Sequence, residues 1–274
     1  MAHPTPTGDN RGMLIKRILF PVDFSDRSRG AASFVEEFVG RFQAELTLLA
    51  VVEPYTYHDT IDKEEEWKKQ LETFGPADFS FFKVNRVLLH GDAAEKIIDF
   101  SRSHPTDLIM MPTQGKGLYR RFLLGSVTAK VLHDADCPVW TGTHMEDAPP
   151  IEKISIRKIL CAVDLDPVGV KTLRWCARLA ECFQAELAGI HVVEPIGDSA
   201  AARAGLDEML RNTGMKSRFD VERGDIAKTI RSAAERMQAD LLVIGRSSQS
   251  GAFGRLTANS YTIVRLAPCP VISV

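Results

Sequence analysis

The sequence predicts an α/β protein built from two tandem domains, each a doubly wound, five-stranded parallel sheet covered by helices. The first observation is an internal repeat. Residues 42–54 (FQAELTLLAVVEP) and 183–195 (FQAELAGIHVVEP) share nine identities in thirteen positions, at an offset of 141. The second observation is that short apolar runs alternate with segments of helical periodicity, which is typical of parallel sheets with helices on both faces. Together they indicate one fold encoded twice.

The repeat continues in the same order along the chain. Residues 17–25 (RILFPVDFS) match residues 158–166 (KILCAVDLD) at the same offset of 141. Residues 90–100 match 223–233 at an offset of 133, and the closing DADCPVW matches LAPCPVI at 132. Because the offset falls by eight, the second copy lacks residues in its middle.

These matches divide the chain into four parts. Residues 1–12 form a disordered lead, 13–145 the first domain, 146–153 a linker and 154–274 the second domain. Pro149-Pro150 and several polar residues favour the linker assignment.

In the first copy, apolar runs predict five strands, namely 18–22, 45–52, 81–89, 107–111 and 138–141. Helical periodicity predicts four helices between them, namely 28–42, 60–74, 93–103 and 126–133. Asp26 or Ser28 is expected to cap the first helix and Asp92 the third.

The second copy repeats this plan, with strands expected at 159–163, 186–193, 216–222, 240–244 and 271–274. Right-handed crossovers then place helices on both faces of each sheet. In such sheets, ligands bind beyond the carboxyl ends of the strands, where the winding direction reverses.

Composition predicts a soluble, cytoplasmic protein. Hydrophobic residues make up 45% and charged residues 26%, and no uninterrupted apolar run approaches the roughly 20 residues of a membrane span. Residues 1–12 lack the apolar core of a signal peptide. The net charge of −2 gives no indication of a nucleic-acid surface, and the five cysteines form no CxxC pair, so we interpret them as buried or incidental thiols.

Two loops of the first copy lie where a ligand is expected. The loop 112–127 (PTQGKGLYRRFLLGSV) follows the fourth strand, and Asp23 follows the first. Gly115 lets backbone amides approach an anion, and Gly125 with Ser126 opens a helix whose free amides, dipole and hydroxyl can meet phosphate. These residues could form a nucleotide site, but a glycine-rich loop is by itself a weak indication of one, because ordinary turns use the same residues.

The segment MPTQGKGLYRRFLLGSVTAKVLHDADCPVW resembles the signature of universal stress proteins, whose nucleotide-binding members carry Gly-x2-Gly-x9-Gly-Ser/Thr here. The resemblance extends over both copies, including ILFPVDFS, AELTLLAVVEP and CPV. It implies a tandem universal stress protein with Rossmann-like, adenine nucleotide alpha hydrolase-like sheets of strand order 3-2-1-4-5. It also implies that the fifth strands join the domains as an internal pseudo-dimer, with a homodimer of whole chains left open.

The same resemblance implies a site for ATP or another adenine nucleotide in the first domain, with Mg as a candidate companion. Asp23 and Val51 would meet the base and ribose. The ribose and phosphates would be held by Gly115, Gly125, Ser126 and Val127. Pro112 departs from the pattern because it replaces the first motif glycine and removes an N–H, so either that amide is dispensable or binding is weakened.

The second copy departs further from the motif. Gly245 is kept, but Ser248 stands at the second glycine, and Thr257 with Ala258 at the Gly-Ser pair. We therefore predict a degenerate site that supports the first domain. Asp164 persists after the first strand of this copy.

The sequence contains no GxxxxGK[ST] loop, GxSxG elbow or HExxH zinc pattern. The resemblance to universal stress proteins implies a stress-response regulator that hydrolyses ATP slowly at most. The alternative is a scaffold that binds no nucleotide and acts on unknown protein partners through its dimer surfaces. Under both hypotheses we expect no binding to nucleic acid or membranes.

Overall fold

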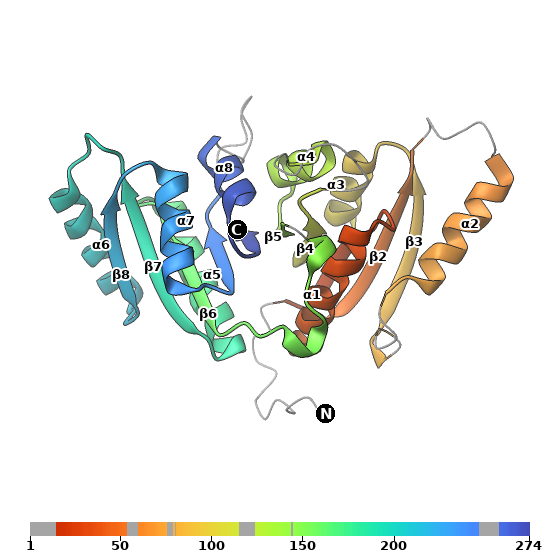
Figure 1. The fold of residues 1–274 in the computed structure, drawn as a ribbon, viewed down its shortest axis with the longest axis horizontal. Helices are drawn as coiled ribbons and strands as arrows, with labels where there is room; N and C mark the ends of the chain where they lie inside the picture. Colours follow the sequence, from red (N-terminus) through yellow and green to blue (C-terminus); the bar gives the residue numbers. More distant parts are fainter. Residues whose placement is uncertain are drawn as a thin grey trace.

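The computed structural model describes residues 15–53, 60–75, 79, 81–114, 124–143, 145–246 and 258–274. Its strands form one ten-stranded sheet with the order β3-β2-β1-β4-β5-β10-β9-β6-β7-β8. Figure 1 shows the two halves side by side, with α2 and α6 at opposite ends and α4 and α8 near the middle. The predicted lead, residues 1–12, lies outside the described residues.

The first half alternates strands and helices as the sequence predicts. Its elements are β1 (Arg17–Pro21), α1 (Asp26–Phe42), β2 (Glu45–Val52), α2 (Thr60–Thr73), β3 (Val84–His90), α3 (Ala93–Ser103), β4 (Leu108–Pro112), α4 (Ser126–Asp134) and β5 (Val139–Gly142). The third strand begins at Val84, whereas the apolar run predicted a start at residue 81. Phe81 and Phe82 precede the strand, and Phe81 is exposed.

Two 3-10 turns, Met145–Asp147 and Ile151–Lys153, connect the halves. The second half then contains β6 (Lys158–Ala162), α5 (Pro167–Phe183), β7 (Glu186–Val193), α6 (Ser199–Thr213), β8 (Arg218–Arg223), α7 (Ile226–Met237), β9 (Leu241–Ile244), α8 (Ala258–Leu266) and β10 (Val271–Ser273).

The strand order 3-2-1-4-5 is confirmed in both halves. Strands within each half are parallel, and the halves join through the antiparallel pair β5 and β10. The expected pairing of the closing strands is therefore present, and it removes two sheet edges that would otherwise be exposed. The domain bounds given above stay a prediction.

Equivalent residues of the two copies face each other at this junction. Trp140 of β5 lies opposite Ile272 of β10, and these positions correspond in the repeat. Phe42 and Phe183 also correspond, and their rings touch edge to face with centroids 5.7 Å apart. The halves are thus related by a local pseudo-two-fold axis, as the subunits of an isologous dimer are.

The segment between the halves packs against α1. Met145 is buried, and a Cβ at Gly30 of α1 would clash with the Met145 carbonyl. Arg27 forms an ion pair with Glu146 at 3.1 Å. This glycine lets the connecting turn approach the helix closely.

Side-chain N-caps mark the starts of α1 and α3. The cap of α1 is Ser25, whose hydroxyl accepts from the Ser28 amide, so the expectation of Asp26 or Ser28 was wrong by a few residues. Asp92 caps α3 as predicted, accepting from the Glu95 amide at 2.8 Å. No helix in the described part of the chain is long and apolar enough to cross a membrane.

Candidate functional site

The described residues of the predicted nucleotide site gather at one edge of the first half. Asp23 follows β1, Val51 lies near the end of β2, and Gly125 precedes α4, which follows β4. Because β1 lies between β2 and β4, the carboxyl ends of these strands share this edge. Ser126 and Val127 form the first turn of α4, whereas Gly115 lies outside the described residues.

The Asp23 carboxylate is held by a small serine network. One of its oxygens accepts from the Ser25 amide at 3.1 Å and from the hydroxyls of Ser25 and Ser28, each at 2.6 Å. Three donors on one oxygen fix the orientation of the carboxylate. Sequence reasoning did not predict that these two serines bind Asp23. The comparison of the two copies offered a signal, because the second copy has other residues at both positions.

Helix α4 begins without a side-chain cap. Gly125 occupies the cap position with φ −62° and ψ 146°, and its amide donates to the Thr113 carbonyl at 2.8 Å. Among the described residues, a Cβ at Gly125 would meet no atom closer than the Thr113 carbonyl oxygen, at 3.4 Å. Neither its backbone conformation nor packing against the described residues requires glycine there. The first amides of a helix have no partner within it and favour an anion.

Pro112, the departure from the motif, is compatible with the strand that contains it. It ends β4 opposite Gly142, and its carbonyl accepts from the Thr128 hydroxyl at 3.0 Å. The amides of Ile109 and Thr113 donate toward β5, so the nitrogen of Pro112, between these positions in the alternation, points toward β1. The pairing of β1 with β4 has already ended there, at Leu19. The missing N–H therefore costs no bond between these strands.

The second half builds its equivalent carboxylate differently. Ser25 and Ser28 correspond to Asp166 and Gly169, so the hydroxyl donors are replaced by a charge and by a residue without a side chain. Desolvation, followed by the charge of Asp166, raises the pKa of the Asp164 carboxyl. His191 Nδ1 hydrogen-bonds to the Val163 carbonyl at 2.8 Å, as expected for a packed histidine.

Gly245, the motif glycine kept in the second copy, has a packing role. A Cβ there would lie 2.9 Å from the Thr172 hydroxyl and 3.3 Å from Val168 of α5. Its retention is therefore explained by the close approach of α5. Ser248 and Thr257 lie outside the described residues, and Ala258 begins α8.

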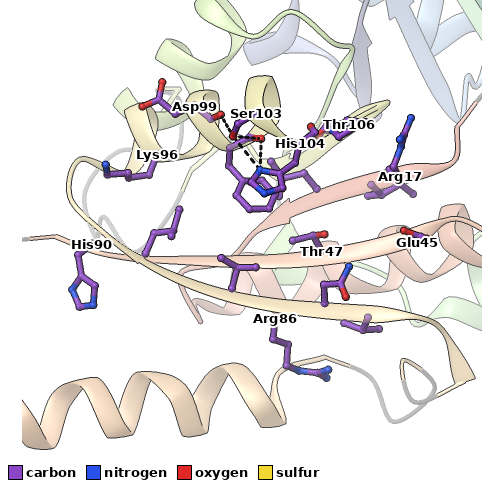
Figure 2. A pocket seen from close by; sticks show the side chains of 18 of the residues that line it. Arg17, Glu45, Thr47, Arg86, His90, Lys96, Asp99, Ser103, His104 and Thr106 are labelled. Carbon is purple, nitrogen blue, oxygen red and sulfur yellow. Dashed lines mark hydrogen bonds between the residues drawn. The ribbon is translucent and has the colours of Figure 1, made fainter.

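A separate groove of about 1280 Å³ lies between α3 and the open face of β2 and β3 (Figure 2). Its lining includes Thr47, Val87 and Leu89 on the strands, Lys96 on α3 and His104 directly after α3. It extends to the amino-terminal ends of β1 and β2, where Arg17 and Glu45 lie, and its lining includes none of the described residues of the predicted nucleotide site.

The two halves differ on this open face. In the first half, β3 presents Asn85, Val87 and Leu89 beside β2. At the corresponding register positions of β8 are Arg218, Asp220 and Glu222. Arg218 is ion-paired with Asp220, and Arg236 with Glu222. The apolar floor of the groove is thus particular to the first half.

Among the described residues, neither the candidate metal ligands nor the cysteine thiols form a reactive site. No group of three or more His, Cys, Asp or Glu side chains there could hold a metal ion. The five cysteines are free, and burial raises the pKa of Cys137 to about 11 and that of Cys269 to about 12. Such thiols are protonated and unreactive near neutral pH.

Comparisons with known proteins agree with this fold. The model of the universal stress protein family matches residues 14–141 and 197–274. The chain belongs to the universal stress protein family. A universal stress protein of Methanocaldococcus jannaschii is 31% identical over 144 residues, covering 46% of this chain and 81% of the relative. One of Mycobacterium tuberculosis is 25% identical over 271 residues, covering 95% of this chain and 96% of the relative.

Solved structures support the tandem arrangement of the universal stress protein fold. The crystal structure of a universal stress protein from Archaeoglobus fulgidus has a TM-score of 0.76 at 24% identity, covering 94% of this chain and 97% of its own. A universal stress protein solved in complex with cAMP matches 44% of this chain at 19% identity and a TM-score of 0.38, a likeness too distant to bear on the ligand here.

Proposed function

We propose that this universal stress protein is a stress-response regulator that binds ATP or a related adenine nucleotide at the carboxyl edge of its first half. Asp23 and Val51 would contact the base and ribose. Gly125, Ser126 and Val127 would hold the phosphates, together with Gly115, as the family motif implies.

The start of α4 carries this proposal. Gly125 has a backbone conformation open to any residue and, among the described residues, room for a Cβ, so its glycine is best explained by a group that must approach the backbone closely. Phosphate fits because the amides and the positive dipole end of the helix favour an anion. In contrast, Gly245 of the second half is explained by packing against α5.

The Asp23 network supports the other end of the site. Its carboxylate is held in one orientation by Ser25 and Ser28, as recognition of a ribose hydroxyl requires. The second half has Asp166 and Gly169 at these positions, and Asp164 there is an acid with a raised pKa. We therefore assign one nucleotide to each chain, in the first half.

Hydrolysis, if present, would be slow. The described residues near the start of α4 include no evident base for activating water, and we expect turnover well below the roughly 1–1000 per second of ordinary enzymes. Any Mg²⁺ would be held mainly by the phosphates. Turnover within that range, abolished by Asp23→Ala, would identify an enzyme.

Isothermal titration with ATP tests the proposal. Wild-type protein should bind one nucleotide per chain, and Gly125→Val or Ser126→Ala should weaken binding about tenfold to a hundredfold, the value of one charged hydrogen bond. Ala258→Gly, at the corresponding position of the second half, is the matched control and should change affinity little. Two equal sites, or affinity unaffected by Gly125→Val, would contradict the assignment; no binding would favour the scaffold alternative.

A further inference from the structure

A buried arginine of the second half reaches into the first. Arg246 directly follows Gly245 at the end of β9 and is 5% exposed. Its guanidinium donates to the carbonyls of Leu132 at 3.1 Å, Ala135 at 3.0 Å and Cys137 at 2.6 Å. Leu132 and Ala135 belong to the C-terminal end of α4, the helix whose opposite end begins at Gly125.

This contact has both a geometric and an electrostatic effect on α4. The last carbonyls of a helix have no partners within the helix and carry its negative dipole end, so a buried guanidinium there satisfies and stabilises them. The planar fork of arginine binds several acceptors at once and restricts their movement. Helix α4 is therefore held from the second half at one end. At its other end, the Thr128 hydroxyl donates to Pro112 of β4 and the Gly125 amide donates to Thr113, the residue after β4.

The contact breaks the pseudo-two-fold symmetry of the molecule. The residue corresponding to Arg246 in the first copy is Thr113, whose hydroxyl donates to Gly142 of its own half. The backbone bonds are equivalent, since Thr113 donates to Gly142 and Arg246 donates to Val274. The Arg246 side chain thus extends from the second half, where the motif is degenerate, into the first half, where most of the motif is kept.

We infer that Arg246 is a positioning residue for the nucleotide site of the first half: by fixing the C-terminal end of α4, it places the amides at the other end to meet phosphate. The inference rests on the proposed function. A nine-residue helix spans about 13 Å, so Arg246 acts without touching the ligand. It also gives the second half a defined role in binding.

Substitution of Arg246 tests this inference by ATP titration of the full chain. Arg246→Thr copies the residue found at this position in the first half, so the local backbone should accept it. We expect the Kd for ATP to rise about twofold to thirtyfold, the range of indirect coupling effects. Arg246→Lys keeps the charge without the fork and should restore part of the affinity.

Thr141→Val is the matched control, because it removes another hydrogen bond between the halves, from the Thr141 hydroxyl to the Val271 carbonyl, without touching α4. It should lower the melting temperature but leave the Kd unchanged. An unchanged Kd in Arg246→Thr, with a loss of thermal stability like that of Thr141→Val, would overturn the inference and leave the proposed function intact.

Hydrogen exchange of the α4 amides without nucleotide separates the two proposals. Exchange should be faster in Arg246→Thr than in Thr141→Val at matched global stability. If wild-type protein does not bind ATP, the proposed function fails, and faster exchange would still support the positioning of α4 by Arg246. Unchanged exchange would overturn that positioning.

Discussion

Single residues separate the two halves of this protein more clearly than their shared fold does. Gly125 and Gly245 are both glycines of the motif region, yet against the part of the chain that the structure describes the first has room for a Cβ and the second does not. Asp23 and Asp164 each follow the first strand of their half. Serine hydroxyls orient Asp23, whereas the charge of Asp166 helps to raise the pKa of Asp164. Equivalent residues can therefore have different functions within one chain.

The two glycines predict opposite responses to one substitution. Gly125→Ser should leave the free energy of unfolding within about 0.5 kcal/mol of wild type, because serine is a good N-cap and its Cβ fits. Gly245→Ser should cost about 1–3 kcal/mol, because the Cβ would overlap Thr172. Urea denaturation of both variants measures the difference. Equal losses would show that the space at Gly125 is not available.

Asp164 predicts a pH-dependent effect on stability. Because its pKa is raised in the folded protein, the fold disfavours the charged form, and this cost is present at pH values above the pKa of the unfolded carboxyl. Asp164→Asn should therefore slightly raise the melting temperature at pH 7.5. The gain should shrink as the pH falls toward about 4, the ordinary carboxyl range. A loss of stability at pH 7.5 would mean that the charge forms favourable contacts.

Secondary-structure elements are stabilised by similar local devices in both halves. Asp92 caps α3 and Asp225 caps the corresponding α7, each accepting an amide three residues along. Helix α4 instead begins with a glycine that supplies no side-chain cap. At its other end, Arg102 donates to the Asp134 carbonyl, and Arg246 donates to the carbonyls of Leu132 and Ala135.

We expect the two capping aspartates to contribute equally to the free energy of unfolding. Asp92→Ala and Asp225→Ala should each lower the free energy of unfolding by about 1 kcal/mol, the usual contribution of an N-cap. Chemical denaturation followed by circular dichroism measures both losses. Asp207→Ala, within α6 and away from any cap, serves as the control. A loss well below 0.5 kcal/mol in both capping variants would show that the caps add little here.

At the scale of the whole molecule, the halves form one structure. The sheet is continuous through β5 and β10, and Phe183 of the second half packs on Phe38 and Phe42 of the first. Arg246 adds a directional contact to this otherwise symmetric junction. Such an interface couples the stability of the halves, so unfolding of one should expose apolar surface of the other.

Phe183→Ala tests this coupling. Removing a buried phenylalanine should cost about 3–5 kcal/mol. We expect one calorimetric transition in wild type and one transition at lower temperature in the variant. Two transitions, with only one of them shifted by the substitution, would show that the halves unfold independently.

The sequence alone determined the plan of this protein. The repeat at offset 141 predicted two copies, and the apolar runs and helical periodicity located the strands and helices within a few residues, because these signals are local. The family resemblance supplied the strand order and the pairing of the closing strands, both of which the structure contains. The assignment of the site residues stays a prediction.

Tertiary structure alone decided how equivalent positions are used. The sequence could not show that Gly245 serves packing, because the atoms it would meet belong to a helix more than seventy residues earlier in the chain. Nor could it show that Arg246 reaches Leu132, since no local pattern marks a contact across 114 residues. Hydrophobic periodicity specifies elements, whereas polar contacts between them depend on where the folded chain brings individual atoms together.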